Sequence, residues 1–126
     1  MSKILLIDDE AVVLDMLETF FKREGFDVAV ASDGDEGLAL NRESPVDLVV
    51  TDILMPHKEG FETIRELKQE FPDVKIVAIS GGGRNNADTY LEFAKTFGAD
   101  RTFSKPLELS ELKAVVEGLL APHNGW

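Results

Sequence analysis

The sequence contains no cysteine and no long apolar run. Without cysteine the chain has neither disulfides nor thiolate metal sites. The longest early apolar run, residues 4–7, is far too short for the core of a signal peptide or for a membrane span. We therefore expect a cytoplasmic protein that does not enter a membrane.

Positive charge is also scarce, with 13 lysine and arginine residues against 24 acidic ones and a formal net charge of -11. Such a field repels nucleic acids and anionic lipids and attracts basic partners. The composition therefore argues against direct binding to nucleic acid or to a membrane surface. The two histidines, His57 and His123, show no metal-ligand spacing, and we assign them no metal.

The 126 residues are enough for one domain, which we place at residues 1–121, followed by a tail at 122–126. Within it, short apolar runs alternate five times with amphipathic stretches. The apolar runs are residues 3–7, 26–31, 48–51, 74–79 and 102–104, and the helical patterns are 11–21, 37–42, 61–71, 87–97 and 109–119. This alternation predicts an α/β fold with a five-stranded parallel sheet and helices on both faces.

Polar side chains follow four of the predicted strands. Asp8 and Asp9 follow the first, Asp52 the third, Ser80 the fourth and Lys105 the fifth. Because parallel strands end at the same edge of a sheet, where α/β proteins bind ligands, we expect these groups to converge.

The expected chemistry follows from the charges of this group. Three close carboxylates cannot all stay ionised without a compensating cation, and Mg²⁺ suits oxygen ligands while keeping positions for water and phosphoryl oxygens. Ser80 and Lys105 would then hold a phosphoryl group carried by Asp52. We therefore predict a phosphoacceptor site with Asp52 as the nucleophile and an acyl phosphate as the product.

Each residue also has a simpler interpretation. Taken alone, Asp9 is better explained as the N-cap of the first helix, Ser80 as a loop hydroxyl and Lys105 as a solvated charge. Asp52, which precedes a proline turn, could simply open that turn. The shared position at successive strand ends favours the functional interpretation.

At this point the chain resembles the receiver domain of two-component response regulators over nearly its full length. The matching motifs are the run Ile4 to Glu10, Asp33-Gly34, the block Asp52 to Pro56 with Gly60 eight residues after Asp52, Ser80-Gly81, Gly98-Ala99-Asp100 and Lys105-Pro106. The resemblance implies a flavodoxin-like three-layer (βα)5 sandwich with strand order 2-1-3-4-5. It also implies a phosphoprotein that receives its phosphoryl group from a histidine kinase or a phosphotransfer protein, and that is no enzyme beyond its own phosphorylation and dephosphorylation.

The same resemblance implies roles for individual residues. Mg²⁺ would be bound by Asp9, Asp52 and the backbone carbonyl of Leu54, with Asp8 acting through water. Ser80 and Lys105, taken with Asp52 as catalytic residues, would bind the phosphoryl oxygens.

Two other functions stay open. An aspartyl-phosphate phosphatase would need a second acid two residues after the nucleophile, where this chain has Leu54. A receiver-like binding module that is never phosphorylated would need none of the five site residues that are present.

The chain departs from the family in its switch region. The family often has an aromatic residue three positions before the lysine, where this chain has Thr102, and Phe103 follows one place later. We expect Phe103 to pack under a helix and residues 81–97 to respond to phosphorylation instead. If the given sequence is the whole gene product, no output domain follows the fifth helical pattern. We then expect signalling by binding a downstream protein or a second copy through the face formed by the fourth helix, the fifth strand and the fifth helix.

Overall fold

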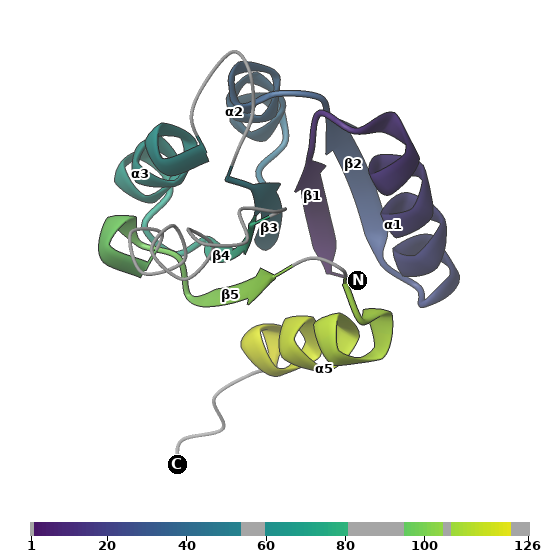
Figure 1. Ribbon diagram of the computed structural model, residues 1–126. Coiled ribbons are helices and arrows are strands. Elements are labelled where there is room, and N and C mark those ends of the chain that lie inside the picture. Colours follow the sequence, from purple (N-terminus) through teal and green to yellow (C-terminus); the bar gives the residue numbers. More distant parts are fainter. Residues whose placement is uncertain (1, 54–59, 81–94, 105–106, 122–126) are drawn as a thin grey trace.

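A computed structural model of the chain describes residues 2–53, 60–80, 95–104 and 107–121. It confirms the predicted alternation of strands and helices (Figure 1). The strands are β1 (Lys3–Ile7), β2 (Asp27–Ala31), β3 (Leu48–Asp52), β4 (Lys75–Ser80) and β5 (Arg101–Ser104). The helices are α1 (Ala11–Arg23), α2 (Gly34–Glu43), α3 (Gly60–Glu70) and α5 (Leu109–Leu120).

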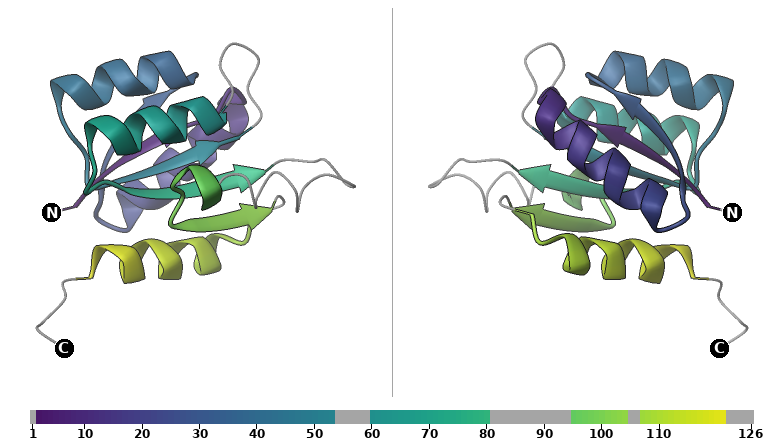
Figure 2. Two further views of the ribbon diagram at one scale, coloured as in Figure 1. Left: turned by 90° about the vertical axis from the view of Figure 1, so that its left-hand side faces the viewer. Right: turned by 90° about the vertical axis from the view of Figure 1, so that its right-hand side faces the viewer.

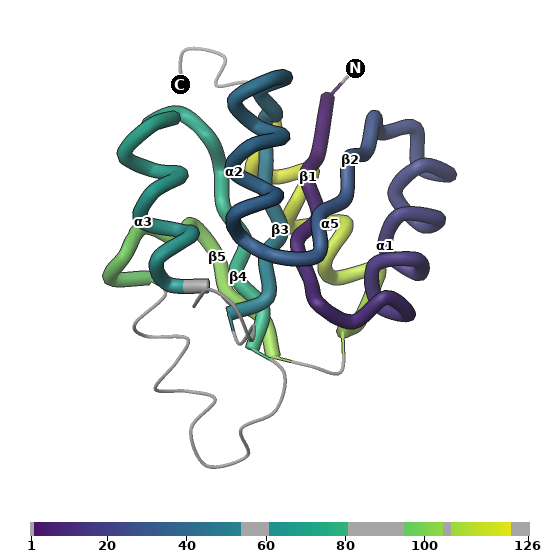
Figure 3. The backbone as a smooth tube through the Cα atoms, turned by 90° about the horizontal axis from the view of Figure 1, so that it is seen from above, coloured from purple at the N-terminus to yellow at the C-terminus, as the bar shows by residue number. Residues whose placement is uncertain are grey.

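The five strands form one parallel sheet in the order β2-β1-β3-β4-β5, as predicted. Each neighbouring pair is parallel, so all five carboxyl ends lie at one edge. Figure 3 shows β1 and β3 side by side. In register, Ile7 pairs with Thr51, and Asp52 pairs with Ile79. The ends of β1, β3 and β4 are therefore brought together at this edge.

Helices cover both faces of the sheet, which makes the predicted three layers. Figure 2 shows α2 and α3 on one side of the sheet and α5 on the other. The α2–α3 side buries Leu38, Ile64 and Leu67 against alternate strand residues, whereas Leu17 and Phe21 of α1 lie in the core on the α5 side. Because each face has its own apolar core, the central strand β3 is buried along its whole length.

The helix α2 is longer than the hydrophobic pattern predicted. It begins at Gly34, three residues before the expected start, because Asp33 acts as an N-cap whose carboxylate accepts the Glu36 backbone N–H at 2.8 Å. Gly37 allows α2 to pack closely against β1. An added Cβ at this position would lie 2.5 Å from Cδ1 of Ile7, which is closer than real Cβ contacts.

The region after β4 is only partly described. Of the expected helix at 87–97, residues 95–97 are helical and the others lie outside the described residues, as does the loop from Gly81 to Asn86. Phe103 packs into the core on the α5 side, which confirms the prediction that it lies under a helix. Gly98 follows the helical residues with a φ of 123°, a conformation that glycine adopts without strain.

Candidate functional site

Asp52 is the last residue of β3, and its backbone is fixed by the sheet. The whole strand is buried, and Asp52 itself is only 4% exposed. The backbone N–H of Ile53 donates to the carbonyl of Ile79 at 2.9 Å, so pairing with β4 continues just past the acid. Thr51 Oγ1 donates to the Asp52 carbonyl at 3.1 Å. The apolar sequence of β3 therefore holds a carboxylate at the carboxyl edge of the sheet.

Asp8 and Glu10 lie beside Asp52 at the end of β1. Asp8 is 2% exposed, and its backbone N–H donates to the carbonyl of Ala31 at 3.2 Å. One carboxylate oxygen of Asp8 accepts the backbone N–H of Glu10 at 2.9 Å. The carboxylate oxygens of Asp8, Glu10 and Asp52 all lie within 4.8 Å of one another. The structure thus gathers three acids, two of them buried, at the place that the strand ends predicted.

Ser80 ends β4 at the same edge. Its side chain is 1% exposed, and its Oγ has no hydrogen-bond partner among the described residues. A buried hydroxyl without a partner costs free energy, so such groups in native proteins call for an explanation. A hydroxyl held at this edge is available to a ligand.

The structure places only some of the predicted site residues together. Asp8, Asp52 and Ser80 lie at the site, whereas Asp9 is exposed and does not join the group formed by Asp8, Glu10 and Asp52. Lys105 and Leu54, predicted to hold the phosphoryl group and the ion, lie outside the described residues.

Glu10 lies in the acidic group although the sequence analysis did not single it out. The sequence contains three consecutive acids, and residue type alone does not tell which of them turns toward the sheet edge. The structure also corrects the simpler interpretation of Asp9, because Glu10 is the N-cap residue of α1.

This arrangement has the chemistry of a site for a hard cation. Two ionised carboxylates with oxygens about 4.8 Å apart would repel by roughly 3 kcal/mol at an effective dielectric constant of about 20, if no other group offset their charge. Mg²⁺ would offset this repulsion, because it binds carboxylate oxygens and keeps positions for water and phosphoryl oxygens. The oxygen-only donor set of Asp8, Glu10 and Asp52 therefore fits Mg²⁺ and not a metal that prefers sulfur or nitrogen.

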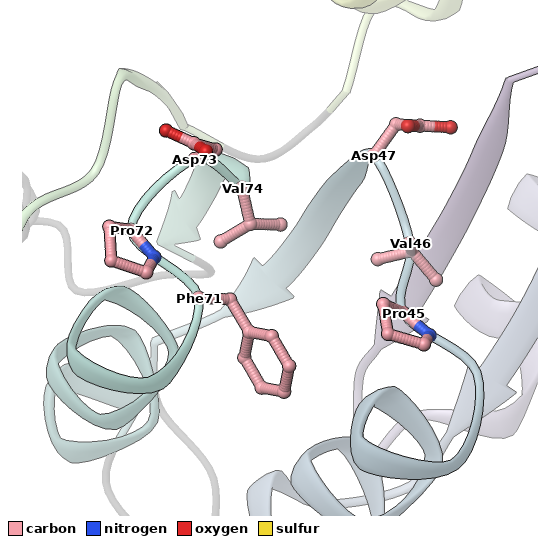
Figure 4. Close-up of a pocket in the computed structure, with 7 residues that line it drawn as sticks. All are labelled: Pro45, Val46, Asp47, Phe71, Pro72, Asp73 and Val74. Atoms are coloured by element: carbon pink, nitrogen blue, oxygen red, sulfur yellow. The ribbon is translucent and has the colours of Figure 1, made fainter.

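A recess of about 280 Å³ lies at the opposite edge of the sheet, between the loops that precede β3 and β4. In Figure 4 the ring of Phe71 points into the space between these loops, and the carboxylates of Asp47 and Asp73 point away from the ring. The lining residues are Pro45, Val46, Asp47, Phe71, Pro72, Asp73 and Val74. Because Asp47 precedes β3 and Asp52 ends it, this recess does not belong to the acidic site.

In the part of the chain that the structure describes, no helix is both long enough and apolar enough to cross a bilayer.

Comparisons with known proteins agree with the geometry. The family model for the response regulator receiver domain matches residues 4–117. The transcriptional regulatory protein CpxR of Klebsiella pneumoniae is 38% identical over 120 residues, which are 95% of this chain and 50% of that protein. The chain spans about half the length of the curated relatives it matches.

Solved structures show the same fold. A response regulator receiver domain protein from Clostridium thermocellum superposes with a TM-score of 0.86 at 30% identity, covering 95% of this chain and 94% of that one. The chemotaxis protein CheY4 of Vibrio cholerae superposes with a TM-score of 0.85, over 95% of this chain and 99% of that one. At 24% identity the second likeness supports the fold alone.

Proposed function

The chain belongs to the family of response regulator receiver domains, and from this premise we propose that Asp52 accepts a phosphoryl group in a reaction that depends on Mg²⁺. Receiver domains are signalling domains and not enzymes in the ordinary sense, so the chemistry we propose is limited to the domain's own phosphorylation and dephosphorylation. The observation that carries the proposal is the burial of Asp52 at the end of β3, with the carboxylates of Asp8 and Glu10 within 4.8 Å.

The phosphoryl donor in this proposal is the phosphohistidine of a histidine kinase or a phosphotransfer protein. A carboxylate oxygen of Asp52 forms a bond to phosphorus while the bond between phosphorus and the imidazole nitrogen breaks. The imidazole nitrogen keeps the electron pair of the broken bond and takes a proton from solvent. The product is an aspartyl phosphate, and no other reactant is needed.

Residues around Asp52 have separate proposed roles. As the family resemblance implies, Asp9, Asp52 and the backbone carbonyl of Leu54 would hold the ion and Asp8 would act through water, and Asp9, which lies outside the acidic group in the structure, would have to turn toward it. When bound, Mg²⁺ offsets the negative charge that the phosphoryl group brings into an acidic pocket.

Two further residues act on the phosphoryl oxygens. The Ser80 hydroxyl donates a hydrogen bond to a phosphoryl oxygen. This role is supported by the burial of the hydroxyl and by its lack of a hydrogen-bond partner among the described residues. Lys105 contributes a positive charge.

The proposal is tested by incubating the protein with acetyl phosphate and Mg²⁺ and recording the intact mass. We expect one phosphoryl adduct on the wild type, no adduct in Asp52→Asn and none in EDTA. Many turnovers to free phosphate would instead indicate a phosphatase, and no reaction would indicate a binding module that is not phosphorylated. An adduct that persists in Asp52→Asn and maps to another residue would contradict the assignment of the site.

We further propose that phosphorylation changes how the domain binds a downstream protein or a second copy. The binding face would comprise residues 87–97, β5 and α5. In its described part, Phe97 is 37% exposed, so part of an apolar side chain is available to a partner. Its ring also contacts that of Phe61 on α3, with the ring centroids 5.7 Å apart. Light scattering with and without beryllofluoride, a mimic of the phosphoryl group, tests the second-copy form of this proposal. A mass unchanged by beryllofluoride would exclude it.

A further inference from the structure

The recess between the loops that precede β3 and β4 has no role in the proposed function. Its volume is about 280 Å³, slightly below the roughly 300–1,000 Å³ of pockets that take whole small molecules. Its size therefore suits a single side chain of a partner better than a small-molecule ligand. Because the recess lies at the edge of the sheet opposite Asp52, a group bound there would leave the acidic site open.

The lining of the recess is mostly apolar. The Phe71 ring points into it, and both Phe71 and Val46 are only half-buried, so part of their apolar surface is open to water (Figure 4). Pro45 and Pro72, one from each loop, are exposed. Covering such surface with an apolar side chain is favourable in proportion to the apolar area removed from water.

Hydrogen bonds hold both loops in place behind the recess. In the first loop, the Val46 backbone N–H donates to Oδ1 of the buried Asn41 at 2.7 Å. In the second loop, the Val74 backbone N–H donates to the Phe71 carbonyl at 3.0 Å, and the Val74 carbonyl accepts the Lys68 ammonium at 2.7 Å. The recess is therefore formed before a partner arrives, which reduces the ordering that binding requires.

One acid stands on each side of the recess. Asp47 belongs to the loop before β3 and Asp73 to the loop before β4, and both are exposed. Neither forms an ion pair with a residue that the structure describes. One oxygen of Asp47 accepts the Lys3 backbone N–H at 2.9 Å, whereas the Lys3 ammonium donates to Ser44. Both carboxylates point away from the Phe71 ring, so they leave the apolar recess clear (Figure 4).

We propose that this recess docks an extended segment of a partner protein in which an apolar side chain lies between two basic ones. The apolar side chain enters beside the Phe71 ring, and the lysines or arginines pair with Asp47 and Asp73. The net charge of -11 adds a long-range attraction for such a segment. In an extended chain, side chains two residues apart point the same way and lie about 7 Å apart, so the basic residues occupy the second position on either side of the apolar one.

The test uses synthetic peptides and the full chain, without Mg²⁺ or a phosphoryl donor. The probe is the blocked peptide acetyl-Lys-Gly-Leu-Gly-Lys-amide, titrated into isotope-labelled protein and followed by two-dimensional NMR. We expect saturable shifts of backbone amides within residues 46–47 and 71–74. Replacing the leucine of the peptide by glycine should weaken binding about tenfold, and replacing both lysines by glutamate should abolish it.

Single charge removals on the protein test the two acids. Asp47→Asn and Asp73→Asn should each weaken binding about twofold to fivefold, the usual effect of an exposed ion pair. Asparagine keeps an oxygen for the Lys3 backbone N–H, so the first loop should stay in place. The matched control is Asp15→Asn, which removes an exposed carboxylate from α1 and changes the net charge equally, and it should bind as the wild type does.

The location of the shifts and the controls decide the matter. Shifts centred on the ends of β1 and β3, or no saturable shifts at all, would overturn the inference. Equal binding of the leucine and glycine peptides would show that the recess is not used, and an equal loss in Asp15→Asn would show attraction to the overall charge alone. The inference does not rest on the proposed function, because the acidic site takes no part in it and a failed phosphorylation assay would leave the titration unchanged.

Discussion

Replacing Ser80 by alanine should stabilise the resting protein and impair its phosphorylation. Ser80 is 1% exposed, and its Oγ finds no hydrogen-bond partner among the described residues. Leaving such a hydroxyl unpaired costs about 1–3 kcal/mol, whereas the void left by one oxygen atom costs less. We therefore expect a gain in unfolding free energy of about 1 kcal/mol, which is about 4 °C in melting temperature for a domain of this size.

A neighbouring hydroxyl provides the matched control. Thr51 is also fully buried near the end of a strand, but its Oγ1 donates to the Asp52 carbonyl at 3.1 Å. Thr51→Val keeps the shape of the side chain and removes this bond, so it should lose about 1 kcal/mol. Thermal or urea unfolding in EDTA, followed by circular dichroism, should thus give changes of opposite sign for the two variants.

A second control separates stability from function. Thr63 on α3 is fully buried, and its Oγ1 likewise lacks a partner among the described residues. Thr63→Val should therefore stabilise the protein as Ser80→Ala does, without affecting the aspartyl phosphate. Loss of a charge-assisted hydrogen bond in Ser80→Ala should lower the phosphorylated fraction by about tenfold or more at a fixed acetyl phosphate concentration.

Two results would each refute a part of this reasoning. If Ser80→Ala lowers the melting temperature as much as Thr51→Val, the Ser80 hydroxyl is already hydrogen-bonded in the resting protein and is not free to donate to a phosphoryl oxygen. If both Ser80→Ala and Thr63→Val leave phosphorylation unchanged, Ser80 has no role at the phosphoryl oxygens.

Two further predictions concern packing and charge. Gly37→Ala should destabilise the domain by about 1–3 kcal/mol in urea unfolding, because the new Cβ would clash with the Ile7 side chain. Alanine has the higher helix propensity, so a variant more stable than the wild type would show that the Ile7 side chain moves aside at little cost. The hydrogen bond from Arg42 lowers the pKa of Glu70 below the ordinary 4.5. The unfolded chain then binds more protons there, so this contribution to stability is present above pH 4.5 and is lost as the pH falls through the lowered pKa. Glu70→Gln should therefore flatten the acid side of a stability profile slightly, since the pair is exposed, and an unchanged profile would mean that the pair contributes nothing.

The sequence was informative wherever burial dictates residue type. The run from Leu48 to Thr51 could be assigned to a strand buried on both faces because its residues are apolar or β-branched, with no alternation of polar positions. Strand parity placed Phe103 correctly under the helices of one face. The location of the site followed from the same reasoning, since parallel strands must end at a common edge.

The missed features depend on local backbone geometry and not on the hydrophobic pattern. The early start of α2 is set by one hydrogen bond from Asp33, and the apolar periodicity that marked the helix begins later. The sequence also did not show which of Asp8, Asp9 and Glu10 lie beside Asp52. The direction of each side chain after β1 depends on the dihedral angles of the turn, and three consecutive acids offer no contrast from which to infer them.

The residues that stabilise this domain and the residues to which we assign its chemistry lie in different parts of the sheet. Two apolar cores fix the strands from both faces, so the backbone at the ends of β1, β3 and β4 cannot easily relax. At these ends lie two buried acids in close proximity and a buried hydroxyl without a partner among the described residues. The Ser80 hydroxyl costs free energy in the resting state, and under the proposed function both it and the acids would be stabilised when a dication and a phosphoryl group bind. Because the sheet holds these strand ends in place, binding of the proposed ligands should stabilise the protein, and we expect it also to favour a different state of the segment that follows Ser80.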